Sequence, residues 1–361
     1  MKKMLYLAPI SFDNLKQRPQ FLAEQLSKVY DVTYLDPTVS MMKYLLKGGE
    51  KPGPRSYQIS DTLRVRRLDG RLSLHRSLEA VSGWLAASER RQMRACLDQT
   101  DCVWVGYAPW YDLLRGYDGR VIYDKMDDDV QITQNGLLRK LIMKVEPKLV
   151  ARADHIFITA EIFSRQLSAS GKRPILIPNG VDRAEVLDRK EPVYRSMPGR
   201  RIFGYVGMIS HWFDMKAIQI ILEADVQNEV VLVGPVEIPR LDHERLTYVG
   251  RVPKEDVGKW IASFDICLYP FKQTTFLDMI NPVKIYEYIA ANKPVLAVNS
   301  LEMAQFLPWV TTYENHEDLL GKLHMLSPQP PFGTEEDRVK FICDNSWERR
   351  GEQILNAICT Y

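Results

Sequence analysis

The sequence has few of the features that mark disulfide-rich, membrane-spanning or fibrous proteins. Its five cysteines are an odd number and include no Cys-x-x-Cys pair, which argues against a disulfide framework and against a zinc site. No stretch reaches the roughly 18 apolar residues of a membrane-spanning helix, and the apolar run after the basic start is too short for a secretory signal. The 20 Gly and 21 Pro are spread thinly, which excludes a fibrous chain. We therefore expect a globular protein that stays in the cytoplasm.

Charge is distributed unevenly along the chain. Residues 1–195 carry 32 Lys and Arg against 24 Asp and Glu, whereas residues 196–361 carry 16 against 22. The basic half is predicted to face an anionic partner, such as an anionic inner-membrane surface or a lipid-linked phosphate. Nucleic acid is not expected as a partner, because the sequence has no zinc finger and no basic run interleaved with aromatic residues.

Short apolar runs alternate with helical patterns through both halves of the chain. This alternation predicts an α/β protein with two Rossmann-like, doubly wound domains whose parallel sheets are covered on both faces. The expected strands lie at residues 4–9, 31–36, 102–105, 120–123, 155–158 and 174–177, and then at 201–206, 230–233, 246–249, 266–269 and 294–297.

The 361 residues suggest two domains, at roughly 100–200 residues per domain. We expect one domain at 1–188 and a second at 198–345, joined by the polar, proline-containing stretch at 184–199. The amphipathic segment 346–361 is a candidate to pack back on the first domain. A ligand would bind at the carboxyl ends of the strands, in a cleft between the two domains.

Two glycines follow the first strand of the second half, in the run Gly-Tyr-Val-Gly at residues 204–207. Gly207 would let the backbone approach a ligand closely, and a following helix would point its free amide groups at a phosphate. Lys216, nine residues later, could reach the same phosphate. The alternatives are a tight turn without a ligand and an ordinary solvated lysine.

A second signal lies at residues 281–295. Asn281 and the following proline would start a helix, and Lys284 and Glu287 lie three residues apart on one face of it. A lysine there suits the phosphates of a diphosphate ligand, and a glutamate suits the diol of its ribose. The alternative is an ion pair within the helix, worth only about 0.3–0.5 kcal/mol.

Three successive carboxylates, at residues 127–129, follow the strand at 120–123. Like charges this close repel each other, so the pKa of at least one carboxyl should be raised, and Asp127 or Asp128 could act as a general base. A metal site is not favoured, because adjacent residues point in different directions. The alternative is a solvated turn in which one carboxylate caps a helix.

A basic stripe is predicted along a helical segment that is interrupted by a proline. Lys140, Lys144, Lys148 and Arg152 recur every four residues. The stripe is a candidate for peripheral attachment to the anionic inner leaflet of the plasma membrane. The alternative is a helix that buries its apolar side in the first domain and solvates its lysines. A second, shorter candidate lies at residues 41–47.

Taken in order, the motifs resemble those of GT-B glycosyltransferases. They resemble most closely the bacterial family-four, or group 1, enzymes of teichuronic-acid, capsular and exopolysaccharide assembly. The resemblance spans nearly the whole chain. It is carried by Arg-Pro-Gln at 18–20, Tyr-Asp at 123–124 with the aspartates at 127–128, Pro-Asn-Gly-Val-Asp at 178–182, Gly-x-x-Gly at 204–207 with Ser-x-Trp-Phe-Asp at 210–214, Leu-Val-Gly-Pro at 232–235, Tyr-Val-Gly-Arg-Val-Pro at 248–253, Lys-x-x-Glu-Tyr at 284–288 and Lys-Pro-Val at 293–295.

The resemblance implies a hexosyltransferase that uses a nucleoside-diphosphate-sugar as donor, with a UDP-sugar favoured, and a lipid-linked or other glycan as acceptor. It implies no cofactor and no metal ion, because enzymes of this fold neutralise the leaving diphosphate with basic side chains and a helix N-terminus. Donor residues would come from the second domain and acceptor residues from the first. The implied donor residues are Gly207, Ser210, Lys216, Asn281, Lys284 and Glu287, and the implied acceptor-side residues are Arg18 and Gln20.

Two positions depart from the family pattern. Glu287 matches the second glutamate of the Glu-x7-Glu motif, but Met279 stands where the first is expected. Met208 stands where the family has a phosphate-binding arginine, and Lys284 is the candidate to supply the missing charge. The resemblance favours retention of anomeric configuration, whereas a base at Asp127 or Asp128 would mean inversion. A sugar-nucleotide 2-epimerase of the same fold and a catalytically silent sugar-nucleotide-binding partner are the alternative functions.

Overall fold

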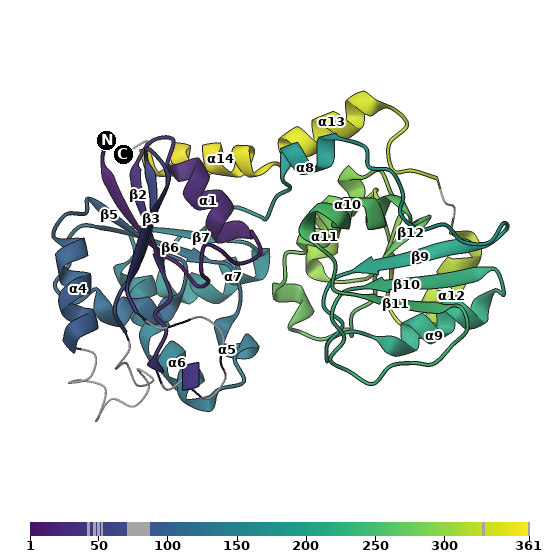
Figure 1. Ribbon diagram of the computed structural model, residues 1–361, viewed down its shortest axis with the longest axis horizontal. Helices are drawn as coiled ribbons and strands as arrows, with labels where there is room; N and C mark the ends of the chain where they lie inside the picture. The colour runs from purple at the N-terminus through teal and green to yellow at the C-terminus, as the bar shows by residue number, and fades with distance from the viewer. Residues whose placement is uncertain are drawn as a thin grey trace. The chain divides into compact units, whose positions relative to one another are not determined.

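A computed structural model describes residues 1–41, 44–45, 48, 51, 53–70, 87–326 and 329–359. Its residues form two compact units (Figure 1). Unit 1 comprises Met1–Pro178 and Arg350–Tyr361, and unit 2 comprises Asn179–Arg349. The short membrane candidate at 41–47 falls largely outside the described residues, because residues 42, 43, 46 and 47 are not among them. No helix within the described ranges has both the length and the apolar character needed to cross a bilayer.

Unit 1 is built on an eight-stranded sheet in the order β3-β4-β2-β1-β5-β6-β7-β8, parallel except for the antiparallel edge strand β3. Every residue of β5 is buried, as expected for a parallel strand covered on both faces. The strands are β1 (Lys3–Leu7), β2 (Asp31–Asp36), β3 (Arg55–Ser60), β4 (Leu63–Arg67), β5 (Cys102–Val105), β6 (Arg120–Lys125), β7 (His155–Ile158) and β8 (Ile175–Leu176). The helices are α1 (Arg18–Leu26), α4 (Ala87–Leu97), η1 (Ala108–Leu113), α5 (Asp129–Ile132), α6 (Gly136–Arg152), α7 (Glu161–Leu167) and η2 (Ser168–Ser170).

Unit 2 is built on a six-stranded parallel sheet in the order β11-β10-β9-β12-β13-β14. The chain leaves β9 toward one edge and returns at β12 to continue toward the other, so the carboxyl ends of these two strands form the topological switch point. The strands are β9 (Arg201–Val206), β10 (Asn228–Val233), β11 (Leu246–Gly250), β12 (Ile266–Tyr269), β13 (Val295–Val298) and β14 (Val310–Tyr313). The helices are α8 (Arg183–Leu187), α9 (Met215–Ala224), α10 (Lys254–Ala262), η3 (Leu277–Met279), α11 (Val283–Ala290), η4 (Leu301–Phe306), α12 (His316–Met325) and α13 (Glu335–Asp344).

The division of the chain differs from the expected domain bounds. Residues 179–188 and the stretch 184–199 lie in unit 2 rather than in the first domain or in a free linker. Arg338 on α13 fixes α8 there, because its guanidinium donates to Val186 O at 3.0 Å and to Leu187 O at 2.9 Å. These hydrogen bonds attach α8 to α13 within unit 2, which the polar composition of the stretch did not reveal.

The last helix, α14 (Trp347–Cys359), runs from unit 2 into unit 1. Within unit 1, Arg120 Nη1 donates to Ile358 O at 2.7 Å. Gly351 packs so closely against α1 that a Cβ there would lie 2.5 Å from Gln25 Cβ. Residues 350–359 therefore form part of the first unit, although they come last in the sequence.

Candidate functional site

The segment after β9 continues alongside the segment after β10. Gly207 N donates to Val233 O and Ile209 N donates to Pro235 O, both at 2.9 Å. Gly234, with φ of 143°, lies directly against this segment, and a Cβ there would be 1.9 Å from Gly207 O. The glycines therefore permit a close approach of two backbone segments at the carboxyl edge of the sheet.

The helix expected to follow Gly207 directly begins only at Met215. Asp214 caps it, since its Oδ1 accepts from the amides of Lys216 at 3.0 Å and Ala217 at 3.3 Å. The expectation of free helix amides next to Gly207 is therefore wrong, because the first amides of α9 already donate to the carboxylate of Asp214. Lys216 is exposed and its Nζ donates to Gln219 Oε1 at 3.2 Å along the same helix, as in the solvated alternative.

Two loops meet at the switch point between β9 and β12. Asp214 N donates to Pro270 O, and Lys272 N donates to Trp212 O, both at 2.8 Å. The exposed Lys272 also donates from Nζ to His211 O at 2.8 Å, so a second lysine lies at this edge. Lys272 was not among the residues expected from the sequence, although its place just after a strand at the carboxyl edge could have indicated it. The Oγ of the buried Ser210 donates to Glu237 Oε2 at 2.7 Å.

Helix α11 is fixed to the end of β9. The hydroxyl of Tyr288 accepts a hydrogen bond from Val206 N at 3.0 Å. Ile285, Tyr286, Tyr288 and Ile289 on this helix are buried. Lys284 and Glu287 lie on its partly exposed face, where Lys284 Nζ is 2.6 Å from Glu287 Oε2. The two groups thus form the ion pair within the helix that was the alternative prediction.

Asn281, just before α11, connects three segments of unit 2. Its Oδ1 accepts from Asn179 N and its backbone oxygen accepts from Asn179 Nδ2, both at 2.8 Å. Its Nδ2 donates to Glu302 Oε2 at 2.9 Å. The side chain of Asn281 is buried, so in this structure it fixes the start of α11 rather than facing solvent.

The acidic segment of unit 1 follows β6. Asp128 caps α5, because its Oδ1 accepts from Val130 N at 3.1 Å and Gln131 N at 3.2 Å, and its Oδ2 accepts from Gln131 Nε2. Asp127 is exposed, and partial loss of hydration raises the pKa of its carboxyl to about 6. Loss of hydration, and then the charge of Asp127, raises the pKa of Asp129 to about 7.

A raised pKa in this segment confirms the expectation that at least one carboxyl would be perturbed, although lost hydration contributes more than repulsion between the carboxylates. Beside the segment, Glu146 Oε1 on α6 accepts from Lys125 Nζ and from Tyr123 OH, both at 2.6 Å. These bonds fix the end of β6. No group of three or more His, Cys, Asp and Glu suited to a metal ion occurs among the described residues.

The two acceptor-side candidates have structural contacts in unit 1. Arg18 is buried and donates from Nε and Nη2 to both carboxylate oxygens of Asp124, and from Nη1 to Ile177 O and Pro178 O. Gln20 is also buried, and its Oε1 accepts from Gln17 N at 3.1 Å to cap α1. Neither side chain is presented to solvent, so the geometry gives each a stabilising role.

The basic stripe lies on α6. Lys140, Lys144 and Lys148 are exposed. Arg152, in contrast, bonds to Asp154 Oδ2 at 3.3 Å and to Gly119 O at 2.5 Å, so it fixes the end of the helix. Exposed apolar side chains lie on α5 and α6 near the lysines, at Ile132, Leu137 and Met143.

Comparison with known proteins identifies the family of the second unit. Residues 200–316 match the family described as Glycosyl transferases group 1, so unit 2 carries a domain of that family. The chain is also similar to TuaH of Bacillus subtilis (strain 168), a protein named for teichuronic acid biosynthesis as a glycosyltransferase. The two are 27% identical over 225 residues, a match that spans 55% of this chain and about half the length of the relative, also 55%.

Similar solved structures show the fold of the whole chain. A sucrose-phosphate synthase from Thermosynechococcus elongatus has a TM-score of 0.69 at 16% identity, with 99% of each chain covered. HepE of Anabaena in complex with UDP and glucose has a TM-score of 0.64 at 14% identity, with both chains fully covered. With its two parallel-dominated α/β sheets, the chain has the GT-B fold.

Proposed function

We propose that this protein is a glycosyltransferase that moves a hexose from a UDP-sugar to a lipid-linked glycan during assembly of a cell-surface polysaccharide. The observation that carries the proposal is the contact between α11 and β9. Tyr288 binds Val206 N at the end of β9, and the same helix carries Lys284 and Glu287. In doubly wound sheets, ligands bind at this kind of switch point.

The ion pair between Lys284 and Glu287 is the proposed donor contact. In the free protein each group neutralises the other at 2.6 Å. When the donor binds, its diphosphate would form an ion pair with Lys284, and the hydroxyls of its ribose would donate hydrogen bonds to Glu287. Lys272, on the neighbouring loop, offers further positive charge to the phosphates. The UDP and glucose of the HepE structure support a UDP-sugar donor.

The proposed transfer uses neither a metal ion nor a cofactor. The bond between sugar C1 and the donor phosphate oxygen breaks, and a bond between C1 and the acceptor oxygen forms. The proton of the acceptor hydroxyl passes to the departing diphosphate, whose charge Lys284 and Lys272 offset. This course retains the anomeric configuration. If Asp127 accepts the proton instead, the configuration inverts, so NMR of the product anomer distinguishes the two.

The experiment that tests the activity is a screen of UDP-, GDP- and dTDP-sugars with a panel of lipid-linked and free glycan acceptors. Transfer from one donor class, lost in Glu287→Ala, supports the proposal. Isomerisation of the donor without an acceptor would indicate a 2-epimerase instead. Tight nucleotide binding without turnover would indicate a silent binding partner, a reading favoured by Met208 and Met279, which stand where the family has Arg and Glu.

We also propose that α6 contacts an anionic membrane surface, where a lipid-linked acceptor would lie. The support is the combination of exposed Lys140, Lys144 and Lys148 with the exposed Leu137 and Met143, since basic and apolar side chains together favour a membrane interface. Flotation with vesicles that contain anionic lipid should recover the protein. Recovery that does not depend on anionic lipid would contradict the membrane contact.

A further inference from the structure

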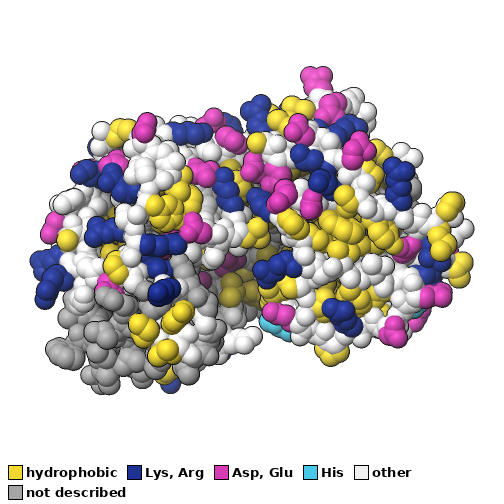
Figure 2. Space-filling model, viewed as in Figure 1, with side chains coloured by type: hydrophobic (Ala, Val, Ile, Leu, Met, Phe, Trp, Pro, Cys, Tyr) yellow, Lys and Arg dark blue, Asp and Glu magenta, His cyan; other side chains and the backbone are white. Residues whose placement is uncertain are grey.

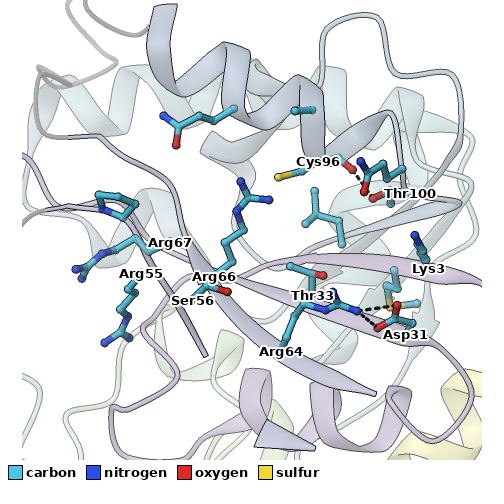
Figure 3. A pocket seen from close by; sticks show the side chains of 16 residues that line it. Lys3, Asp31, Thr33, Arg55, Ser56, Arg64, Arg66, Arg67, Cys96 and Thr100 are labelled. Atoms are coloured by element: carbon cyan, nitrogen blue, oxygen red, sulfur yellow. Dashed lines mark hydrogen bonds and ion pairs between the residues drawn. The ribbon is translucent and has the colours of Figure 1, made fainter. Parts of the chain in front are cut away.

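Unit 1 contains a cavity of about 720 Å³ that the proposed transfer does not use. It lies between helix α4 and the strands β1 to β4 (Figure 3). Among the described residues its wall includes five Lys or Arg and one carboxylate, that of Asp31. Lys3 and Asp31 begin strands β1 and β2, whereas Asp127 follows the end of β6, so the cavity is separate from the acidic segment.

Three of the five cations already have strong partners. Arg55 binds Asp36 and Asp13, and Arg67 donates to Gly53 O at 2.8 Å and Lys51 O at 2.9 Å. Arg64 Nη2 binds both oxygens of Asp31, at 2.7 and 2.8 Å. In Figure 3, Arg55 and Arg67 point away from the centre of the cavity, which leaves the centre to other side chains.

Arg66 differs from these three. It is only partly exposed, and within the described part of the chain it makes no hydrogen bond or ion pair. Figure 3 shows its guanidinium extending from β4 toward Cys96 on α4, into the cavity. A guanidinium stays charged at all ordinary pH values, and its partial burial without a counter-charge is unfavourable. An anion in the cavity would remove that cost.

Other groups around Arg66 complete a site for an oxyanion. Arg64 and Arg66 lie two residues apart on β4 and so face the same side of the sheet. The Nε of Arg64 is buried and has no hydrogen-bond partner within the described ranges. Lys3 and the hydroxyls of Thr33 and Ser56 also line the cavity. Guanidinium, ammonium and hydroxyl donors together suit the oxygens of a phosphate.

We propose that this cavity binds a phosphate-bearing small molecule, with Arg66 as its central contact and Arg64 and Lys3 as supporting cations. Figure 2 shows further Lys and Arg side chains over the visible face of unit 1, which would draw an anion toward this unit. The site is independent of the donor contact on α11, because all of its residues belong to unit 1.

The test is isothermal titration of inorganic pyrophosphate into the full chain carrying Lys284→Ala and Lys272→Ala, which removes both lysines proposed for the donor phosphates. We expect saturable binding that Arg66→Gln weakens at least tenfold, equivalent to about 1.4 kcal/mol. Arg91→Gln is the matched control, because Arg91 is exposed on α4 and does not line the cavity. It should change the affinity less than twofold.

Thermal unfolding without pyrophosphate tests whether Arg66→Gln weakens binding only because the variant is less stable. The melting temperature of Arg66→Gln should be no lower than that of its parent, since Arg66 has no bonded partner among the described residues. Absence of binding, an unchanged affinity in Arg66→Gln, an equal loss in Arg91→Gln or a lower melting temperature in Arg66→Gln would each overturn the proposal. None of these outcomes bears on donor binding at Glu287, so the two proposals can fail separately.

Discussion

Lys284 Nζ lies 2.6 Å from Glu287 Oε2 on helix α11, so the two groups proposed to hold the donor neutralise each other in the free protein. Their side chains are 31% and 22% exposed. A pair this accessible contributes little to stability. A ligand with both a diphosphate and a diol can therefore replace the pair at small cost.

Glu287→Ala should weaken UDP binding at least tenfold, because the ribose diol loses its acceptor, while the melting temperature stays nearly unchanged. Isothermal titration with UDP measures the affinity. The matched control is Lys259→Ala, which breaks an ion pair of the same spacing with Asp256 on α10, at 2.7 Å. Equal UDP affinity in the Glu287 and Lys259 variants would contradict the donor contact.

Asp127→Asn should lower kcat by about a hundredfold or more if its carboxyl accepts a proton, as general bases contribute roughly 10²–10⁴-fold. The pH profile of the unmodified protein should then rise with an apparent pKa near 6, the value to which lost hydration raises this carboxyl. Asp128→Asn is the control, because asparagine also caps helices well. An unchanged kcat in Asp127→Asn would show that this residue does not accept a proton in the reaction.

The stability of unit 1 should fall as pH rises from about 4 to 7. The pKa of Asp129 is raised from 3.8 to about 7 in the folded state, so folding favours its protonated form. Its contribution is complete below the unfolded pKa and is lost as pH rises through the folded pKa. In urea unfolding at pH 5 and pH 8, Asp129→Asn should show a smaller decline than the unmodified protein. Asp98→Asn, at an exposed position, should show the full decline.

Gly234→Ala should destabilise unit 2 by about 3 kcal/mol or more, because its φ of 143° disfavours a side chain and the new Cβ would lie 1.9 Å from Gly207 O. Gly321→Ala on α12 is the contrasting control. Among the described residues, no heavy atom beyond its chain neighbours and the backbone of its own helix lies within 4 Å of the added Cβ, so the change should stabilise by up to about 1 kcal/mol. Urea unfolding measures both. A neutral Gly234→Ala would mean that the two backbone segments do not pack closely.

Arg18→Met should destabilise unit 1 by about 3–5 kcal/mol, the usual cost of leaving one buried charge unpaired. Its partner Asp124 has a fully buried side chain, and their shortest contact is 2.8 Å. Arg115→Met breaks the exposed pair with Asp112 and should cost less than about 1 kcal/mol. Unfolding free energies from urea titration compare the two. Similar small losses would show that the buried pair of Arg18 and Asp124 does not stabilise unit 1.

Most strands could be predicted because a parallel strand in a two-faced sheet is apolar along its whole length, as at 102–105 and 266–269. The hairpin of β3 and β4 was not predicted. Its residues alternate between charged or polar and apolar side chains, and β3 is an antiparallel edge strand. The free helix amides after Gly207 were wrongly expected, because the pattern of two glycines does not reveal that Asp214 caps α9.

The sequence by itself determined most of the succession of strands and helices, the pairing of Lys284 with Glu287 on one helix face and the crowding of three carboxylates after β6, because each depends on residues close together in the chain. Only the tertiary structure decided that Arg18 forms a buried ion pair with Asp124 and that residues 350–359 belong to unit 1. It also decided that Arg66 extends into a basic cavity without a bonded partner among the described residues. These relationships join segments far apart in the chain. Burial and hydrogen bonding, rather than local pattern, determine them.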